Sequence, residues 1–371
     1  MVFGFDQTNI ILRGNLDNSL FMFEKKKIGR VAFMGGSITE MNGYRPLIMD
    51  WLEKRFPKTQ FSFNNAGISS TCSTTGAFRL NRDVLSNGPL DLFFIEFAVN
   101  DNQDANHNHA ACIRGMEGII RQMRTKSPKT EIISTFFVNP GMLKKLQARE
   151  TPLTMRAHQE VLIKYGVSQI NLAREVADQI QKKSLTWSQF GGTHPKKFGN
   201  QMCAEMHFNL LEQAWKDRNP RSRINKSIPT EPINPFSYFN GHFLSPEKIQ
   251  TKNWIYSEPD WSNLPGKKRS RYLDIPMLHS KSVNESLKVN FTGNAIGAFI
   301  VAGPDACVIE YNIDDQPNRS IDLFHRFSSN LHYPRTVIFA HDLNAGTHSL
   351  NLKIKPNSKS KAVRIMEFCI N

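Results

Sequence analysis

The chain has 371 residues, of which 40% are hydrophobic, and its formal net charge is +14. This length suits two domains better than one. No apolar run approaches the roughly 18 residues of a membrane-spanning helix, so we expect no membrane insertion. The positive charge would suit acidic partners, but the Lys and Arg residues are widely spread, which predicts a solvated basic surface and no nucleic-acid site.

Residues 1–27 are expected to form an N-terminal extension. From residue 28 to 217, short apolar runs alternate with amphipathic stretches. Strands are predicted over residues 29–34, 61–63, 90–98, 130–138 and 168–170. Helices are predicted over residues 44–55, 74–85, 110–124, 154–164, 172–182 and 197–216. This alternation predicts a mostly parallel sheet covered by helices on both faces, whose ligands bind beyond the carboxyl ends of the strands.

Residues 218–240 change in character, because several prolines fall in a short polar stretch, and we interpret them as a linker. Residues 241–371 lose the helical periodicity. Strands are predicted there over residues 282–291, 295–301, 307–313, 337–339, 349–354 and 363–370. Turn residues separate these runs, which predicts an all-β sandwich or jelly-roll domain.

The chain has five cysteines, an odd number, and they are widely spaced with no CxxC pair. They are Cys72, Cys112, Cys203, Cys307 and Cys369. This pattern fits neither a disulfide framework nor a zinc site. We expect most of them to be buried as small apolar residues, with one disulfide as the alternative.

Two of the predicted strands end in polar residues that could carry chemistry. Gly36 and Ser37 follow the first strand, and a helix after them offers free backbone N–H groups. Asn100 and Asp101 follow the apolar run 90–98, where an amide N–H could donate to a developing oxyanion. Each pair alone is equally typical of a tight turn or an Asx turn.

A third element is a glycine-rich loop that carries a histidine, over residues 191–195. The proline after His194 biases that residue towards an extended backbone just before the last helix of the α/β part. This histidine could face a site at the edge of the sheet, or it could be an ordinary surface or capping residue.

Together these elements resemble the SGNH (GDSL-like) hydrolase family. Four blocks match its pattern in order and spacing: residues 33–39 (FMGGSIT), 65–70 with 78–80, 97–101 (FAVND) and 191–195 (GGTHP). The sequence departs from the pattern at Gly36, where many members have Asp, and at Ala98, where Gly is usual. The resemblance covers about residues 28–217 and implies a flavodoxin-like three-layer domain.

The resemblance implies a serine esterase. Ser37 would attack an ester carbonyl, and His194 would act as general base and then as general acid. The oxyanion hole would use the backbone N–H of Ser37, a backbone N–H near Ser70 and the side chain of Asn100, each donor being typically worth about 3 kcal/mol of barrier.

Two further departures from the family bear on substrate and mechanism. Ser70 stands where the family has glycine, so its side chain should narrow the pocket and favour a small acyl group such as acetyl. Gly191 stands where the family has the aspartate that orients the histidine. We favour a Ser-His dyad held by a backbone carbonyl in residues 190–192. The alternative is an acid from elsewhere, Glu40, Asp101 or Asp104.

Substrate contacts are expected from Gly36, Glu40, Asp101 and Thr193. We expect neither cofactor nor metal. The histidines at 107 and 109, with Asp101 and Asp104 nearby, lie in a stretch (102–109) that we interpret as a polar loop. Other side chains near the blocks have structural interpretations that we prefer: Cys72 as a packed small residue, and Arg45 and Arg79 as partners of surface acids.

In the second domain, residues 343–352 form a turn-then-strand motif that is similar to those of many carbohydrate-associated β-sandwiches. Trp254, Trp261 and Tyr333 could stack on sugar rings or could fill the core. The resemblance therefore favours O-acetyl ester hydrolysis on a carbohydrate or polysaccharide. The alternatives are a carbohydrate-binding protein with an inactive hydrolase domain and a lipase or thioesterase acting on longer chains.

Location and assembly are weakly constrained. The resemblance favours a secreted or periplasmic protein, although residues 1–10 lack the basic and apolar regions of a secretory signal. The sequence does not predict the oligomeric state.

Overall fold

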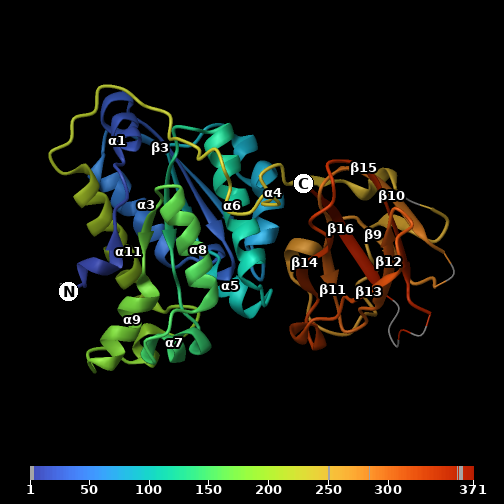
Figure 1. Ribbon diagram of the computed structural model, residues 1–371. Helices are drawn as coiled ribbons and strands as arrows, with labels where there is room; N and C mark the ends of the chain where they lie inside the picture. The colour runs from blue at the N-terminus through green and yellow to red at the C-terminus, as the bar shows by residue number, and fades with distance from the viewer. Residues whose placement is uncertain (1–3, 250, 284, 357, 359–361) are drawn as a thin grey trace. The chain divides into compact units, whose positions relative to one another are not determined.

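The computed structural model describes residues 4–249, 251–283, 285–356, 358 and 362–371. The chain forms two compact units, Met1–Phe239 and Asn240–Asn371. The first mixes helices with a central sheet, and the second consists mainly of strands (Figure 1). Within the described residues, no helix is both long and apolar enough to span a membrane.

The first unit is built on a six-stranded sheet in the order β1-β6-β5-β4-β2-β3. The strands are β1 Ile10–Ile11, β2 Ile28–Gly35, β3 Gln60–Gly67, β4 Leu92–Ile95, β5 Glu131–Thr135 and β6 Ser168–Ile170. Only β1 is antiparallel to its neighbour. The parallel strands have the flavodoxin-like order, which reverses between β2 and β4, where such sheets bind ligands. The predicted three-layer α/β fold is confirmed.

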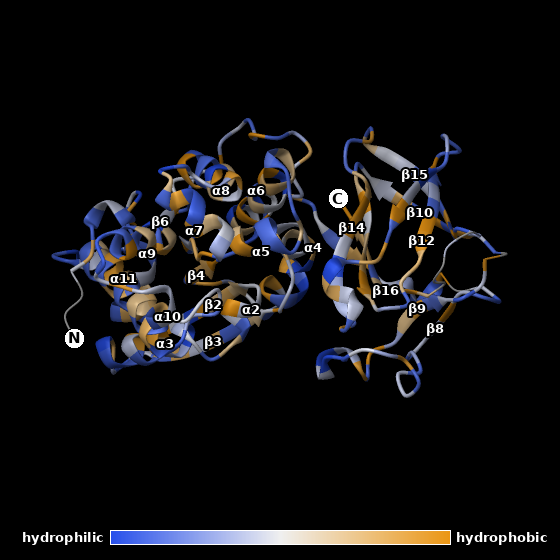
Figure 2. Cartoon of the chain, turned by 90° about the horizontal axis from the view of Figure 1, so that it is seen from below, coloured by the Kyte–Doolittle hydropathy of each residue, from blue (hydrophilic) through white to orange (hydrophobic). Residues whose placement is uncertain are grey.

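Helices cover both faces of this sheet. They are α1 Asp17–Phe21, α2 Ser37–Glu40, α3 Tyr44–Arg55, α4 Ser73–Asp83, α5 Ala98–Gln103, α6 His109–Lys126, α7 Pro140–Gln147, α8 Leu153–Lys164, α9 Leu172–Gln181, α10 Trp187–Phe190 and α11 Lys197–Trp215. Shorter turns are η1 Gln7–Asn9, η2 Met22–Lys26 and η3 Leu85–Asn87. Helices α3 and α11 pack together on one face, and α4, α6 and α8 pack together on the other (Figures 1 and 2).

The two strands at the reversal point form the centre of the core. All four residues of β4 and the last five residues of β2 are buried, because helices cover the sheet on both sides. Phe33 of β2 stacks on Phe94 of β4, with 4.8 Å between the ring centroids. This packing fixes the ends of β2 and β4 next to each other, which is where the candidate site lies.

The segments outside the expected hydrolase domain pack on the first unit. The expected N-terminal extension contributes β1 and α1, and residues 218–239 of the expected linker belong to the same unit. The backbone N–H of Ile224 donates to Asn18 Oδ1 at 2.9 Å, and Lys226 pairs with Glu131 at 3.0 Å. Contacts of this kind leave no periodic pattern in the sequence.

The second unit contains two antiparallel sheets. One has the order β10-β15-β12-β13, and the other has the order β14-β11-β16-β9-β8 with β7 also paired to β16. The strands are β7 His242–Leu244, β8 Ile255–Ser257, β9 Met277–Ser280, β10 Leu287–Gly293, β11 Ile296–Ala302, β12 Val308–Ile313, β13 Arg319–Asp322, β14 Tyr333–Ala340, β15 Gly346–Ile354 and β16 Val363–Ile370. Short turns are η4 Pro246–Lys248, η5 Ser270–Tyr272 and η6 Arg326–Ser329. The predicted all-β domain is confirmed.

A single hydrophobic cluster fills the second unit, and hydrophobic residues concentrate along the strands of both units (Figure 2). Trp254 belongs to this cluster with no exposed surface, and Tyr333 is 2% exposed. Neither ring can stack on a sugar, because neither face is accessible. Trp261 is half-buried, and its indole N–H donates to the carbonyl of Leu273. All five cysteines are buried free thiols, as the spacing of the sequence led us to expect for most of them.

Candidate active site

Ser37 lies at the carboxyl end of β2, where the chain turns sharply into the short helix α2. Two glycines precede it because there is no room for side chains. A Cβ on Gly36 would lie 2.2 Å from Asn100 Oδ1, and one on Gly35 would lie 2.1 Å from Glu96 Oε1. Ser37 itself is half-buried, so its hydroxyl is held on a rigid turn and still reaches the surface.

His194 lies on a short loop between α10 and α11 that is closed at both ends. The backbone N–H of Lys196 donates to the carbonyl of Phe190 at 3.1 Å, and Asn200 Nδ2 donates to the carbonyl of Pro195 at 2.6 Å. The imidazole is exposed, and its Nε2 lies 2.7 Å from Ser37 Oγ. Residues 157 positions apart in sequence therefore share one hydrogen bond.

The structure gives a physical reason for the missing aspartate at Gly191. This residue ends α10 with a φ of +106°, in the left-handed region, and a Cβ there would lie 2.2 Å from the backbone nitrogen of Lys196. The position cannot carry a carboxylate without moving the loop. Among the described residues, Ser37 is the single side chain that hydrogen-bonds to His194.

Two of the acids that could replace that aspartate are engaged in holding candidate oxyanion donors. Glu40 Oε2 accepts from the backbone N–H of Ser69 at 2.8 Å and also from its hydroxyl. The next residue, Ser70, has a φ of +70°, which explains why glycine is usual at this position. Glu40 therefore fixes the turn that presents the backbone of Ser70.

Asn100 lies in the first turn of α5 and is buried, with its amide directly against Gly36. Its Nδ2 donates to Asp104 Oδ2 at 2.8 Å. The sequence placed Asn100 at a strand end followed by a loop, whereas the structure continues residues 98–103 as a helix. Asp104 thus orients the amide that lies beside the turn of Ser37.

Asp101, the third candidate acid, is fully buried behind the site. Its oxygens accept from the backbone N–H of Ser73 at 2.8 Å, from the hydroxyl of Ser73 at 2.7 Å and from His158 Nε2 at 2.8 Å. Burial alone would raise the pKa of Asp101, but His107 and His158 hold it well below its usual range. With no exposed surface, this carboxylate holds α4, α5 and α8 together and cannot touch a substrate.

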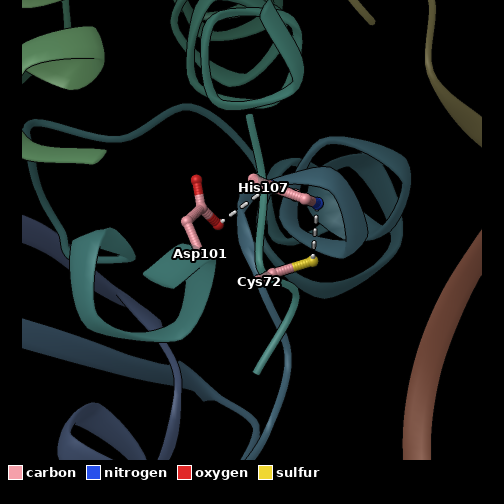
Figure 3. Close-up of side chains that lie close together, drawn as sticks. All are labelled: Cys72, Asp101 and His107. Atoms are coloured by element: carbon pink, nitrogen blue, oxygen red, sulfur yellow. Dashed lines mark hydrogen bonds and ion pairs between the residues drawn. The ribbon is translucent and has the colours of Figure 1, made fainter. Parts of the chain in front are cut away.

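The two histidines of residues 102–109 have different partners in the structure. His109 pairs with Glu160 at 3.1 Å, whereas the ring of His107 lies between Asp101 and Cys72 (Figure 3). Burial opposes the charge of His107, but Asp101 and then Cys72 raise its pKa well above the usual range. Of the remaining sequence-predicted positions, Thr193 is half-buried beside His194.

Glu96 is a buried group at this site that sequence reasoning missed. It follows β4, and its Oε1 accepts from the backbone N–H of Gly36 at 2.9 Å and from Thr39 Oγ1 at 2.8 Å. Burial raises the pKa of Glu96 to about 7. The available signal was a charged residue inside the apolar run 90–98.

Arg79 is the other buried ion beneath the site. Its guanidinium donates to the carbonyls of Ala66 and Gly35, at 2.7 and 3.0 Å, and pairs with Asp83 at 3.1 Å. It therefore joins the ends of β2 and β3. The interpretation of Arg79 as a partner of surface acids was incomplete, because two strand-end carbonyls share the guanidinium.

We expect Glu96 to make the fold less stable as the pH rises. Between about pH 4.5 and 7, the folded chain keeps a proton that the unfolded chain has released, so unfolding becomes easier with increasing pH. The loss reaches up to about 3 kcal/mol. Urea unfolding of the wild type and of Glu96→Gln, which keeps the acceptor oxygen, measures it. A difference in unfolding free energy that stays constant from pH 4.5 to 8 would contradict the prediction.

We expect Gly191→Asp to destabilise the loop and not to create a triad, because a β-carbon has no space there and the φ is left-handed. A lower Tm and lower esterase activity, compared with Gly192→Ala as a control, are the expected results. Gly192 also has a positive φ, +95°, but a Cβ there meets no atom within 4 Å. An active, unchanged Gly191→Asp variant would refute the steric account.

Comparison with known proteins is consistent with this geometry. Residues 33–202 match the model of the GDSL-like lipase/acylhydrolase family. The fold is similar to a two-domain esterase active on acetylated mannans, with a TM-score of 0.78, 16% identity and coverage of 99% of this chain and 98% of that chain. A structure of such an esterase co-crystallized with mannopentaose matches with a TM-score of 0.75, 15% identity and the same coverage.

A search of curated protein sequences finds no match. At these identities the structural likeness establishes the shared two-domain fold, and the family model identifies its first part. Residues 33–202 therefore match the GDSL-like lipase/acylhydrolase family, and this match supports a carboxylic ester hydrolase.

Proposed function

We propose that the chain is a serine esterase that removes O-acetyl groups from a carbohydrate, either a polysaccharide or its fragments. The observation that carries the proposal is the 2.7 Å contact between Ser37 Oγ and His194 Nε2. A serine hydroxyl is a weak nucleophile near neutral pH, and an adjacent imidazole is the usual means of activating it.

In the first half of the reaction, Ser37 Oγ attacks the ester carbonyl while His194 Nε2 takes its proton. The negative charge that develops on the carbonyl oxygen is stabilised by hydrogen bonds. The backbone N–H groups of Ser37 and Ser70 and Nδ2 of Asn100 donate them. These donors are fixed in advance by Glu40 and Asp104, so little reorganisation accompanies the reaction.

In the second half, His194 returns the proton to the leaving sugar alkoxide, and a water molecule then attacks the acyl-enzyme with His194 again as base. We assign this role to a Ser-His dyad. Glu40 and Asp104 have other partners, and Asp101 is buried away from solvent. The exposed imidazole is then positioned by its loop and by the hydroxyl of Ser37.

Two observations support a small acyl group on a carbohydrate. Ser70 stands where the family has glycine, and we infer that its side chain narrows the acyl side of the site. The esterase with the same two-domain fold is active on acetylated mannans, which supports a polysaccharide ester as the substrate.

We expect Ser37→Ala and His194→Ala to lose activity most severely, with kcat reduced about 10²–10⁴-fold for loss of the base. Glu40→Gln and Asp104→Asn should fall well short of this loss, because they position donors and do not hold the imidazole. Initial rates on p-nitrophenyl acetate, with circular dichroism to verify folding, provide the measurement. If either acid variant lost as much as His194→Ala while folded, the dyad would be wrong.

A fluorophosphonate probe separates this proposal from a binding protein with an inactive hydrolase domain, which the missing aspartate favours. Wild-type protein should be labelled at Ser37, and Ser37→Ala should not be labelled. An unlabelled wild type that still binds acetylated glycans would support the binding protein instead.

We expect acetyl esters to be turned over faster than octanoyl esters, because the Ser70 side chain limits the acyl group. The kcat/KM values for the two p-nitrophenyl esters, in wild type and Ser70→Gly, measure the preference. Ser70→Gly should lower the ratio of the acetyl to the octanoyl kcat/KM value. Acetate release from a panel of acetylated glycans then identifies the sugar, and faster octanoyl turnover by the wild type would refute the small-acyl assignment.

A further inference from the structure

Three metal-ligating side chains meet behind the candidate active site. Cys72 immediately precedes α4, Asp101 lies in α5, and His107 lies in the connection to α6 (Figure 3). One donor atom from each, a thiol sulfur, a carboxylate oxygen and a ring nitrogen, can be chosen so that all lie within 4.8 Å of one another. The ester chemistry proposed above uses none of these three side chains.

The separation of one donor pair, in Asp101 and His107, matches that of two ligands of one ion. His107 Nδ1 lies 3.5 Å from Asp101 Oδ1, in an ion pair that is longer than a good hydrogen bond. Nitrogen and oxygen ligands of one tetrahedral zinc lie about 3.4 Å apart, given bond lengths near 2.1 Å. Cys72 Sγ lies 3.9 Å from the other ring nitrogen, Nε2, which also contacts Thr74 Oγ1 at 3.4 Å, so the sulfur has to move towards Nδ1 for all three side chains to share one ion.

Asp101 is already held as metal ligands usually are. The backbone and hydroxyl of Ser73 and the ring of His158 hydrogen-bond to its oxygens and fix its orientation. Such outer-shell bonds orient ligating carboxylates and tune their affinity. The negative carboxylate is therefore pre-positioned before any ion arrives.

A second group, Asp101 with Cys112 and His158, has comparable spacing but is a poorer candidate. His158 is 1% exposed and already donates to Asp101 at 2.8 Å. The side chain of His107 is 14% exposed, so an ion can reach the first group from solvent. An entry path of this kind is one of the requirements of a metal site.

We propose that Cys72, Asp101 and His107 form a binding site for Zn²⁺, with the fourth coordination position taken by water. A thiolate, an imidazole and a carboxylate favour zinc over magnesium or calcium, which prefer oxygen ligands. On binding, the thiol of Cys72 and the imidazolium of His107 release their protons to solvent, and sulfur and nitrogen each donate an electron pair to the ion.

The site adjoins the esterase machinery along the chain, since Cys72 is two residues after Ser70 and Asp101 directly follows Asn100. Zinc would draw its ligands together and shift the two oxyanion donors, so bound zinc inhibits ester hydrolysis. This second effect rests on the proposed function, whereas zinc binding itself does not.

Binding can be measured on the full chain after removal of metals with a chelator. Titration with Co²⁺ should give a sulfur-to-cobalt charge-transfer band in the near ultraviolet, and Zn²⁺ should abolish it. Competition with a chromophoric chelator should give one zinc per chain. Absence of the charge-transfer band in the folded wild type would overturn the proposal without recourse to any variant.

Variants locate the site. Cys72→Ser and His107→Ala should each weaken zinc binding at least about 10-fold, since even outer-shell partners contribute this much. The matched controls are Cys307→Ser, a buried thiol of the second unit, and His109→Ala, whose ring pairs with Glu160. Equal zinc affinity in all four folded variants would place the ion elsewhere and refute the assignment.

Inhibition is tested separately on p-nitrophenyl acetate. Zinc should lower the rate of the wild type and of His109→Ala, and much less that of His107→Ala. Stoichiometric binding without inhibition would leave the zinc site standing and refute its coupling to the oxyanion donors. If the wild type showed no esterase activity at all, the proposed function would fail while the cobalt spectrum still decided the zinc site.

Discussion

The site depends on a lack of space around Gly36. The amide of Asn100 lies on one side of this residue, and the buried carboxyl of Glu96 accepts its backbone N–H on another. Any side chain at position 36 would displace the amide, so the turn that carries Ser37 and the helix that carries Asn100 can only be packed this closely through glycine. The reversal of strand order between β2 and β4 brings these two turns together.

A second constraint separates the roles of the nearby acids. Three carboxylates belong to the sequence blocks that carry the candidate nucleophile and Asn100, yet each has a different task in the structure. Glu40 fixes the turn of Ser69, Asp104 orients Asn100, and Asp101 joins three helices from inside. The imidazole is left with Ser37 as its side-chain partner, and in the proposed dyad the loop, closed by one backbone hydrogen bond and one from Asn200, takes over the orienting task of the aspartate.

The sequence was sufficient to predict elements and site residues whose signal lies in neighbouring residues. Continuous apolar runs predicted β2 and β4, and glycine-rich turns located Ser37 and His194, whose contact the structure then supplied. It was insufficient where a residue's environment depends on distant segments. Glu96 looked like part of a strand, Asp101 could face substrate or interior, and the pairing of β1 with β6 leaves no periodic signal. Helix α7, residues 140–147, was missed although Met142, Leu143 and Leu146 recur at helical spacing and are buried.

Ser70 connects the architecture of the turn with evolution of the acyl pocket. A non-glycine residue with a φ of +70° costs of order 1 kcal/mol, so the polypeptide tolerates local strain at the position whose side chain we propose restricts the acyl group. At this single residue, acyl-group selectivity and low backbone strain therefore favour different side chains. Evolutionary replacement of Ser70 by glycine would remove the backbone strain and, under this proposal, also the selectivity for small acyl groups. No reacting atom would change.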